Sequence, residues 1–202
     1  MKLAAIKQAL AAISPLAIEQ TEYAGKGFVL DVKVAADQVV EAAIVLDKED
    51  FFIEAVTGVD WLGEKEALKK EAEKQAAAAA AAKAKAAAEA AEAAGEEAPA
   101  APAPAPAPAS VPSEDVAPLI DDLEVVYDFN RYDQLCRVVI RTRVPRDNPE
   151  VPTISKVYPG ANWHERETHD FFGIKFIGHP DLSPLLLPED ADYHPLLKDF
   201  TV

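Results

Sequence analysis

The sequence predicts an α+β fold, a small sheet with flanking helices, that is interrupted by a long insertion. Apolar and polar side chains alternate in residues 28–34 and again in residues 124–129 and 136–144, which is the period of a half-buried strand. Residues 2–13 instead repeat their apolar side chains at helical spacing. Between these regions the composition changes, because residues 64–118 contain 25 alanines and 7 prolines. We therefore expect the elements on both sides of the insertion to share one core.

The first part of the domain, residues 1–63, is expected to hold a second helix and a second strand as well. Asp37 is placed to cap that helix, because a side-chain oxygen at a helix N-terminus accepts hydrogen bonds from free backbone N–H groups. The second strand is expected from Phe51 to Val56, and Thr57–Gly58 should end it.

The second part of the domain, residues 119–202, opens with a predicted β-hairpin whose turn is formed by residues 130–133. Cys136 lies on the apolar side of its second strand, so we expect a buried, unreactive thiol. Because an isolated hairpin is only marginally stable in water, it needs the strands of the first part to complete a sheet. The other face of the second strand is expected to be exposed and basic, through Arg137, Arg141 and Arg143.

The inserted segment, residues 64–118, is predicted to be a linker in two sections. Residues 64–94 are rich in Ala, Glu and Lys, which favour a solvated helix. Residues 99–108 alternate proline and alanine, which is typical of an extended polyproline-II spacer. Two interpretations remain open: a tolerated insertion, which we prefer because long loops cost little extra entropy, and a swinging arm that tethers a carrier or interaction domain.

The charge balance excludes some classes of function. The protein has 202 residues, 35 of them acidic and 20 basic, for a net charge of -15. A protein that binds nucleic acid through its phosphates needs a basic patch, so we expect no nucleic-acid partner. One cysteine cannot supply an iron–sulfur cluster, and no stretch reaches the length of a membrane span. We expect contact with a membrane only through partner subunits.

A predicted helix at residues 162–173 carries His164 and His169, which invites comparison with a zinc site. The two histidines are five residues apart, about 140° around a helix, so they do not face one metal ion. Asn162 and Glu165 have the spacing of a capping-box variant, and Gly173 is expected to end the helix.

The C-terminal residues 174–202 form a tail that prolines interrupt every few residues. Such a segment has little regular structure of its own in which to bury its leucines. It therefore either wraps its own domain or lies on another protein.

The helix and the tail together resemble one protein family, the 30-kDa-type subunit of respiratory NADH:quinone oxidoreductase (complex I). Related subunits occur in deazaflavin-linked dehydrogenases and in membrane-bound, energy-converting nickel–iron hydrogenases. The resemblance extends upstream to Pro159–Trp163 and Val151–Thr153, and more weakly to Thr57–Trp61. The residues that carry it are Glu165-Arg166-Glu167, Asp170-Phe171-Phe172-Gly173-Ile174, Gly178-His179-Pro180-Asp181-Leu182, Leu186-Leu187-Pro188-Glu189-Asp190, Pro195-Leu196 and Lys198-Asp199.

This resemblance implies a non-catalytic subunit of the peripheral arm that binds no cofactor or metal itself. NAD, flavin, iron–sulfur or nickel–iron groups are expected in partner subunits. The expected partners are the large quinone-site or nickel–iron-type subunit and the small iron–sulfur subunit, on the cytoplasmic side of the cell membrane. The expected partner-binding residues are Glu165, Arg166, Glu167, Asp170, Phe171, Phe172, His179, Pro180, Asp181, Leu182, Leu186, Leu187, Lys198 and Asp199.

The sequence departs from the family pattern at three places. Ser183-Pro184 replaces the usual basic pair, Leu197 replaces an arginine, and the Ala/Pro-rich insertion is not part of the pattern. The quinone-oxidoreductase and hydrogenase alternatives, the electron donor and acceptor, and any pumped ion therefore stay open.

Overall fold

The computed structural model describes residues 3–64, 70, 74 and 121–201. The predicted helical and polyproline sections of the linker therefore lie outside the described residues, apart from Glu64, Lys70 and Lys74. Residues 1–62 and 121–202 form one compact unit. Its elements are α1 (Leu3–Ala11), β1 (Ala17–Gln20), α2 (Tyr23–Lys26), β2 (Leu30–Lys33), the 3-10 turn η1 (Ala36–Gln38), α3 (Val39–Asp47), β3 (Phe52–Asp60), β4 (Asp122–Asn130), β5 (Val138–Pro145), β6 (Glu150–Pro152), α5 (Ala161–Phe172) and β7 (Lys175–Ile177).

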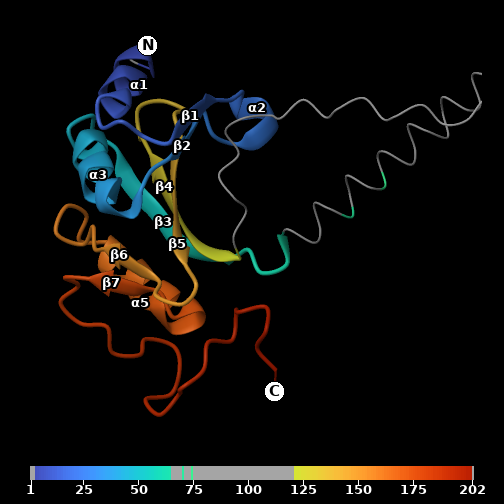
Figure 1. Ribbon diagram of the computed structural model, residues 1–202. Helices are drawn as coiled ribbons and strands as arrows, with labels where there is room; N and C mark the ends of the chain where they lie inside the picture. Colours follow the sequence, from blue (N-terminus) through green and yellow to red (C-terminus); the bar gives the residue numbers. More distant parts are fainter. Residues whose placement is uncertain (1–2, 65–69, 71–73, 75–120, 202) are drawn as a thin grey trace, which may run out of the picture. The chain divides into compact units, whose positions relative to one another are not determined.

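The central sheet has five strands in the order β1-β2-β5-β4-β3 (Figure 1). The predicted hairpin forms, with Val125 opposite Thr142 and Phe129 opposite Val138. Strand β3 pairs antiparallel with β4, so residues from before and after the insertion lie side by side. Strand β2 runs parallel to β5, while β1 returns antiparallel on the outside. The predicted α+β class is confirmed.

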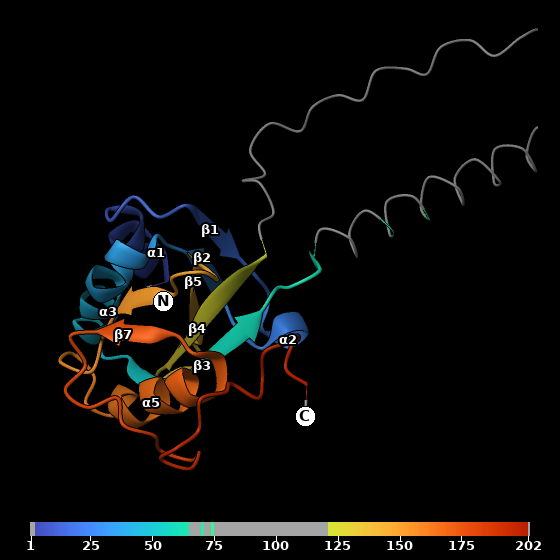
Figure 2. The ribbon, with the colours of Figure 1, turned by 60° about the horizontal axis from the view of Figure 1, so that its bottom comes forward.

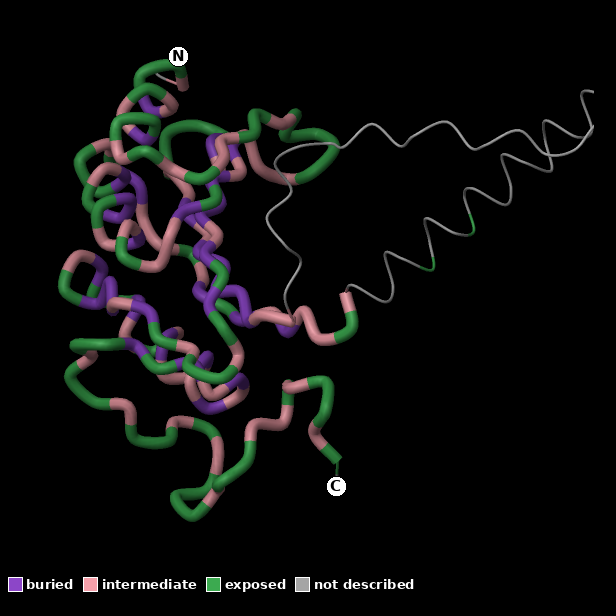
Figure 3. Tube along the Cα trace, in the orientation of Figure 1, coloured by how far each residue is buried: buried purple, intermediate pink, exposed green. Residues whose placement is uncertain are grey.

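Helices α1, α3 and α5 cover one face of this sheet, together with the short parallel pair β6–β7 (Figure 2). The largest buried side chains come from both layers. Leu10 of α1 and Leu46 of α3 are fully buried, and so are Tyr127 of β4 and Ile140 of β5. Figure 3 shows the buried residues concentrated in the sheet and under these helices, while the C-terminal tail alternates between exposed and half-buried positions.

Three local expectations need correction. Strand β3 does not end at Thr57–Gly58 but continues to Asp60, because β4 pairs with it along that whole length. Asp37 does not cap α3, because a 3-10 turn precedes the helix and Gln38 accepts the Ala35 N–H at 3.2 Å instead. Helix α5 begins at Ala161, so Asn162 lies inside it rather than at its cap.

The opposite face of the sheet is not the basic surface that the alternating arginines predict. Arg141 Nε lies 3.1 Å from an Asp31 oxygen on β2, and its Nη1 lies 3.4 Å from Glu124 on β4. Arg137 is similarly within 3.3 Å of Asp128. Acidic side chains of the neighbouring strands therefore neutralise the arginines. Val139 lies between Arg137 and Arg141 on β5 and is only 2% exposed.

Candidate protein-docking surface

Helix α5 lies on the sheet through one buried stripe and turns its polar side toward the tail. Ala161, Glu165, Thr168 and Phe172 are spaced by four, three and four residues, and all are buried. The helix ends as predicted at Gly173, whose φ of 72° is the left-handed conformation that a side chain disfavours. Helix α5 packs so closely on β3 that position 58 requires a glycine, because a Cβ atom there would lie 2.5 Å from the ring of Phe172.

Glu165 occupies a core position of this stripe and does not reach the surface. Its side chain is fully buried, Oε1 accepts the Ile154 N–H at 2.8 Å, and Oε2 is hydrogen-bonded to the Thr153 hydroxyl. Burial raises the pKa of the Glu165 carboxyl to about 7, although the two hydrogen bonds act in the opposite direction. Glu165 therefore lies inside the domain, and its expected role in partner binding stays a prediction.

Asp170 and Arg166 hold the beginning of the tail against α5. Asp170 Oδ2 accepts the N–H groups of Leu185 and Leu186 at 2.8 Å each, and more weakly that of the next residue at 3.4 Å. The Arg166 guanidinium donates to the carbonyls of Ser183 and Pro184 at 3.0 to 3.2 Å. Two charged side chains of the helix thus replace the backbone partners that an irregular segment lacks.

The turn between β7 and this segment is anchored through His179. Its side chain is fully buried, with Nε2 3.2 Å from the Asn162 carbonyl and Nδ1 3.1 Å from the Asp181 N–H. Since Nδ1 accepts from a backbone donor, the ring is neutral and carries its hydrogen on Nε2. His179 is therefore a structural residue of the turn, while Asp181 and Pro180 are exposed.

The middle of the tail returns to the C-terminal end of α5. His194 Nδ1 donates to the Asp170 carbonyl at 2.8 Å, and Leu196 N–H donates to the Phe171 carbonyl at 3.2 Å. A Cβ atom on Gly173 would lie 2.7 Å from the His194 ring, so the glycine also makes room for the tail.

The end of the tail is fastened to the end of β3 by Asp60. One Asp60 oxygen accepts the Lys198 N–H at 2.8 Å, and the other lies 2.5 Å from Arg146, which also pairs with Asp199. Burial raises the pKa of Asp60, but Arg146 and the backbone donors outweigh it, so the pKa lies below its ordinary value. Neither Asp60 nor Arg146 is among the predicted site residues. The available signal in the sequence is that Asp60 lies within Thr57–Trp61, the weaker part of the resemblance.

On its outer side the tail and its neighbours expose apolar side chains. We call this group the tail surface: Trp163, Ile177, Leu186, Tyr193 and Leu196, which are 59%, 52%, 61%, 41% and 52% exposed. Arg166 lies over the Trp163 ring, 5.4 Å from its centroid. The hydrogen-bonded side of the tail therefore faces its own domain, and apolar groups face outward.

The predicted site residues divide by exposure. Glu165, Asp170 and Phe172 are buried. Exposed positions are Pro180, Asp181, Leu186, Lys198 and Asp199, and half-buried ones are Arg166, Glu167, Phe171, Leu182 and Leu187. His179 is half-buried as a whole residue, although its side chain is fully buried. Phe171, Leu182 and Leu197 also pack against the core. Partner binding stays a prediction for all of these residues.

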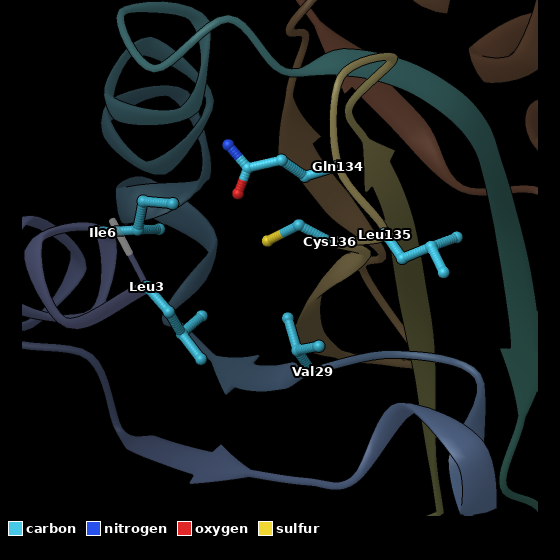
Figure 4. Close-up of a pocket in the computed structure, with 6 residues that line it drawn as sticks. All are labelled: Leu3, Ile6, Val29, Gln134, Leu135 and Cys136. Atoms are coloured by element: carbon cyan, nitrogen blue, oxygen red, sulfur yellow. The ribbon is translucent and has the colours of Figure 1, made fainter. Parts of the chain in front are cut away.

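A small cavity lies at the other side of the domain, between α1 and the β4–β5 loop (Figure 4). Leu3, Ile6, Val29, Gln134, Leu135 and Cys136 line it. Its volume of about 30 Å³ admits a water molecule or two, far less than the ~300–1,000 Å³ of small-molecule sites. Cys136 is 8% exposed, and burial raises the pKa of its thiol.

The described residues contain no group of three or more His, Cys, Asp or Glu side chains that could hold a metal ion. Within the same residues, no helix is both long and apolar enough to cross a membrane.

Residues 110–202 match the sequence profile of the family described as respiratory-chain NADH dehydrogenase, 30 Kd subunit. The F(420)H(2) dehydrogenase of Methanosarcina mazei has a subunit that is 45% identical over 84 residues, which cover 41% of this protein and 53% of that subunit. An NADH-quinone oxidoreductase subunit of Roseiflexus sp. is 49% identical over 76 residues, covering 38% and 44%. The match thus spans about half the length of these relatives.

Two solved structures share the fold. A trypsin-resistant fragment of Nqo5 matches with a TM-score of 0.52 and 22% identity, over 90% of this protein and 100% of the fragment. A polypeptide of the membrane-bound sulfane sulfur reductase, an archaeal respiratory membrane complex, matches with a TM-score of 0.59 and 20% identity, over 100% and 86%.

Proposed function

We propose that this protein is a non-catalytic subunit of a complex-I-like oxidoreductase. The premise is that residues 110–202 carry the domain of the 30-kDa subunit family of respiratory-chain NADH dehydrogenase. It binds through its tail surface to the large subunit that borders the quinone site. The observation that carries this proposal is the tail itself, which is hydrogen-bonded to its own domain on one side and apolar on the other.

The internal hydrogen bonds prepare the tail for a partner. Arg166 and Asp170 fix residues 183–187 on α5, so the entropy of ordering this segment is not lost again on binding. Leu186 is then held outward next to two half-buried leucines. A pre-ordered surface with an apolar centre and flanking charges is the composition of a stable protein interface.

Electron transfer in such a complex is assigned to groups in other subunits. The proposed partners are the large subunit and the small iron–sulfur subunit, and NAD, flavin and clusters belong to partner proteins. The protein is then peripheral, on the cytoplasmic side of the membrane, and reaches the membrane through those partners.

Two related assemblies are alternatives of the same class. The likeness to an F(420)H(2) dehydrogenase subunit favours a deazaflavin-linked complex. An energy-converting nickel–iron hydrogenase is the other. The carrier or interaction-domain alternative depends on residues 64–118, which lie almost entirely outside the described residues, and it stays a prediction.

Co-purification from native membranes tests the proposal. We expect a tagged wild-type protein to bring down a large subunit and a small iron–sulfur subunit, identified by mass spectrometry. The double variant Trp163→Ser, Leu186→Ser should recover at least tenfold less of both, because it removes two apolar anchors without touching the tail's hydrogen bonds.

Leu135→Ser is the matched control, since Leu135 is 79% exposed in the β4–β5 loop. It should recover the partners normally. Equal recovery from the double variant and the wild type would contradict docking through the tail surface. Nickel-ligand cysteines in the recovered large subunit would select the hydrogenase alternative.

A further inference from the structure

We propose that Glu165 is a proton-controlled latch, which loosens the turn of residues 178–183 when its carboxyl group loses a proton. Four structural features support this: the burial of the carboxyl group, the neutral state of the histidine above it, a hydrogen-bond series that suits a protonated acid, and the position of the turn as a cover.

The first feature is a buried carboxyl group for which the described part of the protein supplies no lysine or arginine partner. The groups that face Glu165 are Tyr127 from β4, His179 from the turn, and the hydroxyl and backbone N–H of residues 153–154. Tyr127 is fully buried, and both burial and the nearby Glu165 keep its phenol uncharged. The guanidinium of the next residue along the helix, Arg166, points to the tail instead.

The second feature is the tautomer of His179. Its Nε2 lies 3.8 Å from Glu165 Oε2, close enough for an ion pair if the ring were charged. However, Nδ1 accepts the N–H of Asp181, and a charged imidazole has no free acceptor. In the closed turn the histidine is therefore neutral, and an ionised Glu165 would be an unpaired buried charge.

The third feature is a short series of hydroxyl groups that accepts the proton of a neutral Glu165. Thr153 Oγ1 is hydrogen-bonded to Glu165 Oε2 on one side and to Ser155 Oγ, at 2.7 Å, on the other. A protonated carboxyl group can donate to Thr153, which in turn donates to Ser155. Every polar atom of this series then keeps a partner, so the neutral acid loses no hydrogen bond there, although the hydroxyl can equally donate to an ionised Glu165.

The fourth feature links the proton to the turn. The side chain of His179 is fully buried over Glu165, so lifting the turn hydrates the carboxyl group. Hydration restores the ordinary acidity of the group. Because linkage is reciprocal, loss of the proton favours the lifted turn by the same factor.

The pH range follows from the two protonation equilibria. The Glu165 pKa is about 7 in the closed state, against an ordinary value of 4.5. The protonated carboxyl group stabilises the closed turn, and this contribution is complete below pH 4.5, the ordinary pKa. The contribution is lost as the pH rises to about 7, the pKa in the closed state. Between about pH 5.5 and about pH 7.5, the opening constant of the turn should rise roughly twentyfold.

Amide hydrogen exchange of the full-length protein, corrected for intrinsic rates, tests the latch on the peptide that spans residues 178–187. We expect the twentyfold rise in the wild type and no such rise in Glu165→Gln, which is permanently neutral and keeps the shape. The variant retains every other titratable group, so a pH dependence that both proteins share does not come from residue 165. An equal rise in both proteins, or a flat profile in the wild type, would overturn the proposal.

If Glu165→Gln does not fold, infrared difference spectra of the wild type decide the question. A buried protonated carboxyl band should be present at about pH 6 and lost by about pH 8; absence of that band at the lower pH would overturn the latch. Any effect of the latch on assembly rests on the proposed function. The exchange experiment uses the protein alone, so failure of the latch and failure of docking are distinguishable.

Discussion

Substituting Asp170 by alanine should release residues 183–187 from α5. In the wild type this carboxylate is 4% exposed and accepts two backbone N–H groups at 2.8 Å and a third at 3.4 Å. Hydrogen bonds to a charged group contribute about 1.5–3 kcal/mol each. Leu186 is exposed, so its amide can bind water once it is freed, which reduces the net loss.

We therefore expect Asp170→Ala to weaken the local structure by about 3 kcal/mol, a roughly hundredfold increase in the opening constant of the segment. Asp170→Asn should lie between this and the wild type, because its amide oxygen still accepts but carries no full charge. Amide exchange of the peptides from 183 to 190 measures both values, and circular dichroism checks that the domain remains folded.

Glu167→Ala is the control on the same helix. Within the described residues Glu167 makes no hydrogen bond or ion pair, so its removal should leave the exchange of the tail unchanged. If the amides of residues 185–187 are as well protected from exchange in Asp170→Ala as in the control, the carboxylate does not hold the tail. The proposal of a pre-ordered docking surface then loses its support.

Two further substitutions test the packing and the electrostatics around the tail. Gly58→Ala should destabilise the domain by about 1–3 kcal/mol in urea unfolding, because the new methyl group would lie 2.5 Å from the Phe172 ring. Gly25→Ala is the control and should be nearly neutral, because there is open space around that position. Equal losses of stability in the two variants would argue against the close approach at Gly58. The pKa of Asp60 is lowered in the folded protein, so its ionised form should contribute stability above pH 3.8 that is lost as the pH falls below that value. Asp60→Asn should therefore reduce the loss of unfolding free energy between neutral and acidic pH. An unchanged loss at acidic pH would refute the pairing of Asp60 with Arg146.

Local patterns in the sequence predict the elements better than their contacts. The alternation in residues 124–129 and 136–144 and the glycine after Phe172 correctly place the hairpin and the end of α5, because both depend on neighbours in the sequence. The prediction of a basic arginine face is wrong because its acids arrive from other strands. Asp31, for example, meets Arg141 only through the parallel pairing of β2 with β5.

The candidate site shows the same division. The burial of Glu165 has a signal in the sequence, since Ala161 and Phe172 share its stripe at helical spacing. The role of Asp170 has none, because it depends on where an irregular tail returns to the helix. A family resemblance marks both residues as important, and only the three-dimensional contacts separate residues that hold the tail from residues that it presents.

Photo-crosslinking from the tail surface most directly tests the central claim, that this surface binds the large subunit. A photoreactive amino acid replaces Leu186, and in a control protein it replaces Ile44, which is 38% exposed on α3. The complex is assembled in native membranes, irradiated and analysed by mass spectrometry. We predict a crosslink to the large subunit from position 186 and none to it from position 44. A crosslink to the large subunit from position 44 alone, or from neither position in an intact complex, would contradict the account.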